Sequence, residues 1–334
     1  MKKIVCIFLI FLNLVFLVGC NSYDVSKILF IASVGIEKKE DEYQGYFYLP
    51  LSSDIGKTEN TENNGKGEFA KTTGKSIPEL FSNLQNSTSF VMNLKHVSSI
   101  VLNQELLNEE FIMDFLDYIK FSLDIDFNCY IFVTTEKMDE LFDFQNPNQE
   151  SVLISLLVST NDVDPSFLAT PPIHFLKFAR EFYKDRSIIL PMLTIEEIWT
   201  IDGEPVKNFH AQNAIYYYKG TLKEVTKHPS SPYFSVASEF VDEVEKTSIC
   251  FKDYKYKLDF KEVLHLDVFF SYQIYKSENL LQKEDIKAFV YNRIKSYLLE
   301  FQEMDPLNLN YFNSVYNTSC SYETIDIQIN VLRN

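Results

Sequence analysis

The residue with the clearest chemistry is Cys20, which ends the sequence Leu-Val-Gly-Cys after an apolar segment spanning residues 4–16. Two lysines stand before that segment, and the small residue Gly19 directly precedes the cysteine. This order of charged start, apolar stretch and small residue is typical of a secretory signal that a peptidase removes. The sequence therefore predicts a bacterial lipoprotein in which residues 1–19 are removed and the Cys20 thiol carries a diacylglyceryl thioether.

A transmembrane helix is the alternative for the same segment. It is disfavoured because the run is shorter than the roughly 20 apolar residues that a span needs, and because Asn13 interrupts it. Two acyl chains on Cys20 suffice for stable attachment to a bilayer. We therefore expect a function at a membrane surface outside the cytoplasm.

The charge of the chain is strongly acidic and excludes one class of partner. The full sequence has a formal net charge of −16, and removing the two signal lysines makes it −18. Nucleic-acid binding draws on clustered Lys and Arg, and this chain has no such cluster. An acidic body is also repelled by anionic headgroups, so the lipid on Cys20 must provide the attachment.

The remaining cysteines predict neither a disulfide framework nor a metal site. Cys6 lies in the signal, and Cys129, Cys250 and Cys320 are far apart and form no C-x-x-C pair. We expect these three to be buried free thiols that act as small apolar side chains.

A phosphate-binding loop is suggested by Gly74-Lys75-Ser76, but the pattern is incomplete. Such a loop needs a glycine five residues before the Gly-Lys pair, where this chain has Phe69, and Gly67 is two residues too distant. Ser76-Ile77-Pro78-Glu79 instead has the form of a capping box with proline in the first helical turn. We therefore predict a helix start at Ser76.

Other motifs of catalysis or metal binding are weak. The five histidines are isolated, and Asp124-x-Asp126 and Asp162-x-Asp164 lack the glycine and distal glutamate of a calcium loop. No G-x-S-x-G sequence occurs. We predict no catalytic residue, no cofactor and no metal site, and hence a binding or scaffold role.

The elements that would carry such a role alternate between strands and helices up to residue 186. Residues 28–36 and 43–51 form a predicted hairpin, and residues 52–75 read as a long exposed loop. A predicted helix follows, with Ile77, Leu80, Phe81, Leu84 and Val91 on one face. Strands are expected over 96–102 and 127–134, and helices over 107–119, 138–144, 151–159 and 172–183.

The rest of the chain is richer in strands until its last helix. Predicted strands cover 188–190, 193–199, 213–218 and 222–225, with Lys219-Gly220 as a hairpin turn. A strand over 263–275, a helix over 283–301 and a closing strand with alternating Ile325, Ile327, Ile329 and Val331 complete the chain. We predict an α+β protein of three domains, each a sheet packed with helices: 20–186, 187–249 and 250–334.

Several segments, taken in order, resemble a known family. They are Cys20 with Asp24, the strand and turn over residues 28–38, Gly74-Lys75-Ser76-Ile77, Leu94-Lys95-His96, and Asp114-Phe115-Leu116. Near the end, a helix reaches Gln302 and is followed by Asp305. This order is similar to that of the lipoprotein C subunits of nutrient germinant receptors in endospore-forming bacteria, the Ger(x)C type.

The chain departs from the family pattern at two places. The tryptophan that usually follows the lipidated cysteine is replaced by Asn21-Ser22-Tyr23, and the turn over residues 306–310 has no glycine. The resemblance implies three α+β domains, no catalytic activity, and two membrane-embedded partner subunits at the outer face of the spore inner membrane. A solute-binding lipoprotein of a membrane transporter is the alternative function, and a surface hydrolase is a third class.

Overall fold

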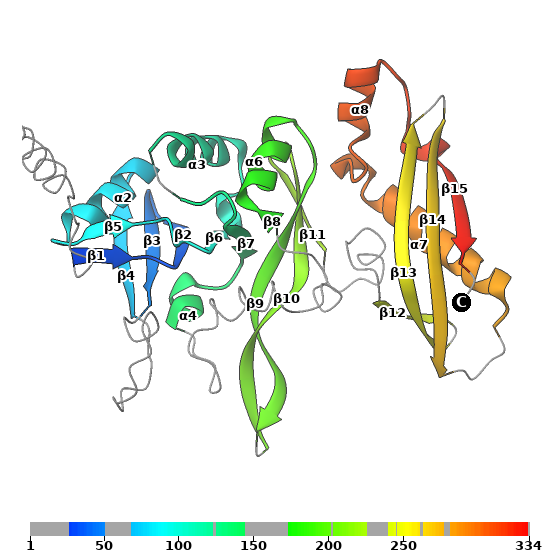
Figure 1. Cartoon of the computed structure of the whole chain (residues 1–334), viewed down its shortest axis with the longest axis horizontal. Helices are drawn as coiled ribbons and strands as arrows, with labels where there is room; N and C mark the ends of the chain where they lie inside the picture. Colours follow the sequence, from blue (N-terminus) through cyan, green and yellow to red (C-terminus); the bar gives the residue numbers. More distant parts are fainter. Residues whose placement is uncertain are drawn as a thin grey trace, which may run out of the picture.

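The computed structural model describes residues 27–50, 68–122, 125–143, 173–201, 203–225, 240–244, 246–260, 263–276 and 281–332 (Figure 1). Within these residues the strands form a nine-stranded sheet, a four-stranded sheet and a two-stranded sheet. Helices pack against the two larger sheets, which confirms the predicted α+β class.

The larger sheet has the strand order β11-β10-β9-β7-β6-β2-β3-β4, and β8 also pairs with β7. Its central strands β2, β6, β7 and β9 are parallel to one another, while the outer strands β3, β4, β10 and β11 pair antiparallel with their neighbours. The strands are β2 (Ser33–Lys39), β3 (Glu42–Leu49), β4 (Glu68–Gly74), β6 (Ser99–Asn103), β7 (Tyr130–Thr134), β8 (Ile173–His174), β9 (Ile188–Ile201), β10 (Glu204–Tyr218) and β11 (Thr221–Val225).

Helices cover both faces of this sheet because its central strands are buried on both sides. In β6, Ile100 and Leu102 belong to the core under three helices, while Val101 belongs to the core under a fourth. The first face carries α2 (Ile77–Asn86), α3 (Glu109–Ser122) and α6 (Phe175–Tyr183), with the 3₁₀ turn η3 (Gln104–Leu106) before α3. The opposite face carries α4 (Met138–Asp143) (Figure 1).

A short two-stranded sheet lies beside α2. Its strands are β1 (Ile28–Phe30) and β5 (Val91–Asn93), which run parallel with Ile28 opposite Val91. The pairing brings the first described residues of the chain next to the segment that follows α2.

The second large sheet has the order β12-β13-β14-β15, with β15 parallel to β14. One long helix, α7, packs on it through Ile286, Val290 and Ile294. The elements are β12 (Phe240–Val244), β13 (Thr247–Phe260), β14 (Leu264–Lys276), α7 (Lys283–Glu300), η6 (Gln302–Met304), α8 (Leu309–Tyr316), η7 (Tyr322–Thr324) and β15 (Asp326–Val331).

Strand β10 joins the two cores because its side chains alternate between them. Ile215 and Tyr217 are buried in the core of the nine-stranded sheet, whereas Tyr216 and Tyr218 are buried in the core of the four-stranded sheet. Tyr216 packs on Phe301 with ring centroids 5.4 Å apart. Because successive side chains of a strand point to opposite faces, this part of β10 is buried on both of its faces.

The strongest local patterns are confirmed. Helix α2 begins after Ser76, α7 spans residues 283–300, and Lys219 and Gly220 both have positive φ, as a two-residue hairpin turn requires. The alternation in β15 is confirmed in its first half, where Asp326 and Gln328 are exposed and Ile327 and Ile329 are partly buried, but Asn330 is also partly buried.

Two expectations differ from the structure. Val91 does not share the face of α2, because the helix ends at Asn86 and Val91 is an exposed residue of β5. Residues 68–74 form strand β4 on the edge of the sheet rather than loop, with Phe69 packed against Phe142. The helix expected over residues 151–159, and the loop residues 52–67, lie outside the described residues.

The predicted middle domain, 187–249, is divided between the two large sheets. Strands β9 to β11 continue the nine-stranded sheet through the parallel pairing of β9 with β7, while β12 pairs with β13. The division of the chain into three domains stays a prediction.

Candidate functional site

Cys20, the predicted lipidation site, lies outside the described residues, and its modification stays a prediction. The other three cysteines of the mature chain, Cys129, Cys250 and Cys320, are buried, and none forms a disulfide with another described residue. Burial raises the pKa of the Cys129 thiol to about 12, so this side chain is a protonated apolar group at neutral pH.

The Gly74-Lys75-Ser76 segment begins a helix. The amide of Glu79 donates to Ser76 Oγ at 3.3 Å, and the Glu79 carboxylate accepts from the amide of Lys75 at 2.9 Å. A Cβ at Gly74 would lie 2.5 Å from the Leu80 nitrogen, so glycine is needed for the close approach of strand and helix. These contacts account for the motif without a phosphate.

Within the described part of the chain, no three His, Cys, Asp or Glu side chains are grouped closely enough to hold a metal ion. Asp126 accepts from the amide of Asn128 within a turn, and Nδ1 of His174 lies 2.8 Å from the carbonyl oxygen of Asn128. Asp124, Asp162 and Asp164 lie outside that part. Asp126 therefore has a local structural role in its turn.

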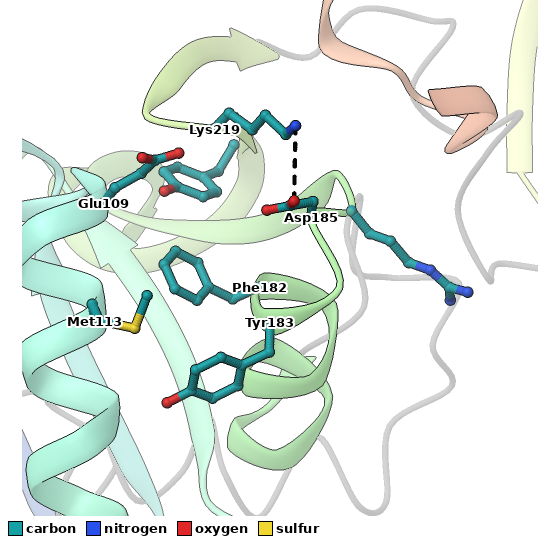
Figure 2. Close-up of a pocket in the computed structure, with 8 residues that line it drawn as sticks. Glu109, Met113, Phe182, Tyr183, Asp185 and Lys219 are labelled. Carbon is teal, nitrogen blue, oxygen red and sulfur yellow. Dashed lines mark ion pairs between the residues drawn. The ribbon is translucent and has the colours of Figure 1, made fainter. Parts of the chain in front are cut away.

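A small cavity of about 170 Å³ opens between α3, α6 and the β10–β11 turn (Figure 2). It is smaller than the roughly 300 Å³ at which pockets for drug-sized ligands begin. Its lining combines two carboxylates, two cations, one thioether and three aromatic rings: Glu109, Met113, Phe182, Tyr183, Asp185, Arg186, Tyr217 and Lys219.

The cavity can bind a small polar group, but its side chains are poorly suited to catalysis. Burial raises the pKa of Tyr183 and of Tyr217 to about 12, which keeps both phenols protonated at neutral pH. Tyr183 donates to Asp117 at 2.8 Å, and Lys219 forms an ion pair with Asp185 at 3.8 Å. The lining includes no serine, cysteine or histidine that could act as nucleophile or base.

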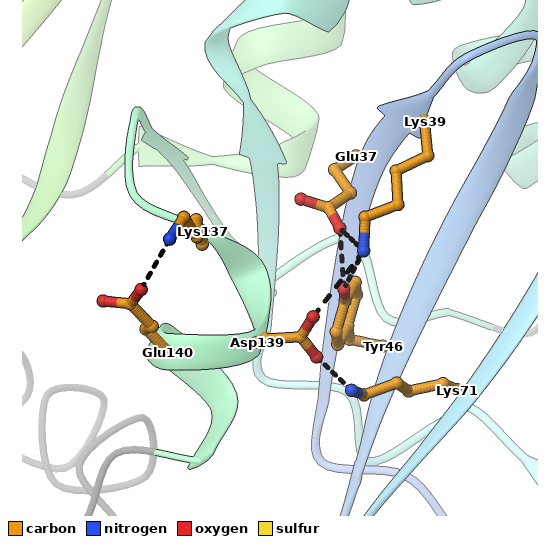
Figure 3. A network of polar contacts seen from close by, with 7 residues as sticks. All are labelled: Glu37, Lys39, Tyr46, Lys71, Lys137, Asp139 and Glu140. Atoms are coloured by element: carbon orange, nitrogen blue, oxygen red, sulfur yellow. Dashed lines mark hydrogen bonds and ion pairs between the residues drawn. The ribbon is translucent and has the colours of Figure 1, made fainter.

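A polar network joins α4 to the nine-stranded sheet, on the face that lies away from α2, α3 and α6 (Figure 3). The buried Tyr46 hydroxyl donates to Glu37 Oε1 at 2.6 Å, and Lys39 lies 3.1 Å from the same oxygen. Asp139 of α4 pairs with Lys39 and with Lys71, and the hydrogen bond from Lys71 lowers the pKa of its carboxyl. Opposite charges are matched throughout, which is typical of a structural network.

Asp305 is the most buried carboxylate among the described residues. Its carboxylate accepts from the amides of Leu309 at 2.6 Å and Asn310 at 3.0 Å, and from the Tyr322 hydroxyl at 2.7 Å. The two amides belong to the first turn of α8, where a negative charge is favoured. Burial raises the pKa of Asp305, although the three hydrogen bonds act in the opposite direction.

The Asp305 turn also joins the two large sheets. Asn308 Oδ1 accepts from the Ser187 amide at 2.7 Å, and Ser187 Oγ lies 2.9 Å from the Asp305 carbonyl oxygen. The Arg186 guanidinium stacks 3.9 Å from the centre of the Tyr311 ring. Sequence reasoning singled out Asp305 through the family resemblance, but it missed Ser187 and Asn308, since no local pattern links residues so distant in the chain.

Comparisons with known proteins identify the family. The family model described as "Spore germination protein N-terminal domain" matches residues 21–195, just over half of the chain. Comparison with curated protein sequences gives no match. Among solved structures, the crystal structure of the GerBC protein aligns with 12% identity and a TM-score of 0.47, covering 90% of this chain and 97% of that chain. The chain therefore belongs to the spore germination protein family that this N-terminal domain defines, and it is a germination receptor subunit of the C type.

Proposed function

We propose that this chain is a non-catalytic lipoprotein subunit of a nutrient germinant receptor, which acts with membrane-embedded partner subunits at the outer face of the spore inner membrane. The observation that carries the proposal is the family match, which begins at residue 21, directly after Cys20. The predicted modification site and the family domain are thus adjacent in the sequence.

The anchor supports the proposal physically. No helix within the described ranges is both long enough and apolar enough to cross a bilayer. A lipid on Cys20 would attach the chain to the membrane, and individually weak contacts with membrane partners could then suffice because tethering raises their effective concentration.

The chemistry of the described side chains supports a non-catalytic role. In the cavity the phenols are protonated, and in the network of Figure 3 the carboxylates are matched by lysines. The buried carboxylate of Asp305 is saturated by donors from its own chain. The Tyr183 hydroxyl, the network carboxylates and Asp305 are thus paired with groups of their own chain.

The alternative, a solute-binding lipoprotein of a transporter, calls for two similar α/β lobes. The two large sheets here differ in size and in topology, since one is a nine-stranded mixed sheet and the other has four strands with a single parallel pair. The receptor function therefore agrees better with the architecture.

A genetic experiment tests the proposal. Spores that lack the gene should fail to germinate with at least one nutrient, and wild-type protein should restore the response. Cys20→Ala should restore it poorly, whereas Cys250→Ala, the same substitution at a buried cysteine, is the matched control. Normal germination of the deletion spores with every nutrient tested would refute the receptor function.

A further inference from the structure

One part of this acidic chain is free of carboxylates. Acidic residues make up 47 of 334 positions, yet positions 80–104 contain neither Asp nor Glu, the longest such run in the chain. Positions 25–36 also lack acidic residues. At the average density, runs of this combined length would carry several carboxylates.

The fold brings these two runs together. Strand β1 comes from the first run and β5 from the second, and they pair in parallel with Ile28 opposite Val91. Two backbone hydrogen bonds extend the contact, from the Ile31 amide to Asn93 O and from the Ser98 amide to Ala32 O. In Figure 1 this β1–β5 edge lies at one end of the long axis, and the four-stranded sheet lies at the other.

The β1–β5 edge exposes apolar and basic side chains. Phe90 is 42% exposed and Val91 is 51% exposed, and both are preceded by small polar residues over 87–89. Lys27 and Lys95 are exposed on the same edge. An exposed aromatic and an aliphatic residue beside lysines are typical of surfaces that insert into the headgroup layer of a bilayer.

The connection to Cys20 limits where this edge can be. Eight residue steps lead from Cys20 to Ile28, so at about 3.6 Å per residue the start of β1 lies within about 29 Å of the anchor. The rest of the chain is acidic and is repelled by anionic headgroups, whereas this edge is neutral to basic.

We propose that the β1–β5 edge is the membrane-docking face of the protein, with Phe90 and Val91 inserted among lipid headgroups beside the Cys20 anchor. This proposal rests on the anchor of the proposed function. It orients the molecule so that the four-stranded sheet, at the opposite end of the long axis, projects away from the bilayer (Figure 1).

The test supplies the anchor chemically. The mature chain, residues 20–334, is coupled through the Cys20 thiol to a maleimide lipid in mixed phosphatidylcholine–phosphatidylglycerol vesicles, since the other three cysteines are buried. Amide hydrogen exchange is compared between attached and free chain. We expect the amides over 88–95 to exchange about tenfold more slowly on attachment. Burial of the apolar side chains among the headgroups is favourable, so these amides would open to water less often. Those over 313–317 should not change.

Matched variants sharpen the test. Val91→Glu adds a carboxylate to the edge and should abolish the slowing, whereas Val315→Glu changes a residue of nearly equal exposure, 52%, at the far end and should leave it intact. Unchanged exchange over 88–95 in the attached wild-type chain would overturn the proposal. Slowing that appears only when membrane partner subunits are added would also overturn it, and would identify a protein interface instead. Because the tether is chemical, either result is independent of whether cells lipidate Cys20, which the mass of the mature N-terminus reports separately.

Discussion

Replacement of Asp305 tests whether this single buried carboxylate holds the C-terminal turn. The side chain is 1% exposed and accepts three hydrogen bonds, two of them from the first turn of α8. Asp305→Ala leaves three donors without their acceptor, at about 1 kcal/mol or more each. Its φ of 51° also lies in the left-handed region, where alanine costs roughly 1 kcal/mol more. We therefore expect a loss of about 3–5 kcal/mol in the free energy of unfolding.

Asp305→Asn tests how much of this loss comes from the missing hydrogen-bond acceptor and the left-handed backbone together, because asparagine largely keeps both. Asparagine tolerates the left-handed conformation and keeps one carbonyl oxygen as acceptor, so the expected loss is only about 1 kcal/mol. Asp326→Ala is the control, since Asp326 is half-exposed and its only described pairing is with His265; we expect a change below about 1 kcal/mol.

Urea unfolding followed by circular dichroism measures these differences. With a slope of about 2–3 kcal/mol per molar, Asp305→Ala should lower the midpoint by roughly 1–2 M without a large change in slope. If Asp305→Ala unfolded within about 1 kcal/mol of wild type, or if the alanine and asparagine variants were equally stable, the assigned role of the carboxylate would be refuted.

Three further predictions concern other contacts. Thiol titration of the folded mature chain at about pH 8 should leave its buried cysteines unreacted, and denaturation should release three thiols if Cys20 is lipidated; a fourth would show that it is not. Tyr46→Phe removes the donor to Glu37 and should cost about 1 kcal/mol in urea unfolding, and a neutral effect would contradict a role for that bond. The Ser187 hydroxyl donates to Asn308 Oδ1 at 3.1 Å, and a double-mutant cycle on Ser187→Ala and Asn308→Ala should give a coupling energy of about 1 kcal/mol for this side-chain bond, whereas additive losses would mean that the bond does not help to join the two sheets.

Local patterns predicted local structure well. The capping sequence at Ser76 and the apolar face of α7 each lie within a few turns of helix, so neighbouring residues suffice to define them. Lys219-Gly220 is another local signal, because a two-residue turn needs positive φ at both positions.

Structure that depends on distant residues could not be predicted in the same way. The sequence predicts two strands over 188–190 and 193–199, whereas β9 runs unbroken from Ile188 to Ile201. The strand passes through Pro191, which cannot donate to the sheet, beside a register shift in β10. The Ser187–Asn308 contact joins positions 121 residues apart. Strand β10 reads as an ordinary strand, and only the second sheet explains why both of its faces are apolar.

The most direct test of the proposed function is to purify the tagged protein from spore inner membranes in mild detergent and identify what accompanies it. We predict that two membrane-embedded subunits copurify with it, that its N-terminal residue is a diacylglyceryl Cys20, and that Cys20→Ala reduces the yield of both subunits. Recovery of the lipidated protein without any membrane-embedded subunit would contradict the proposed function.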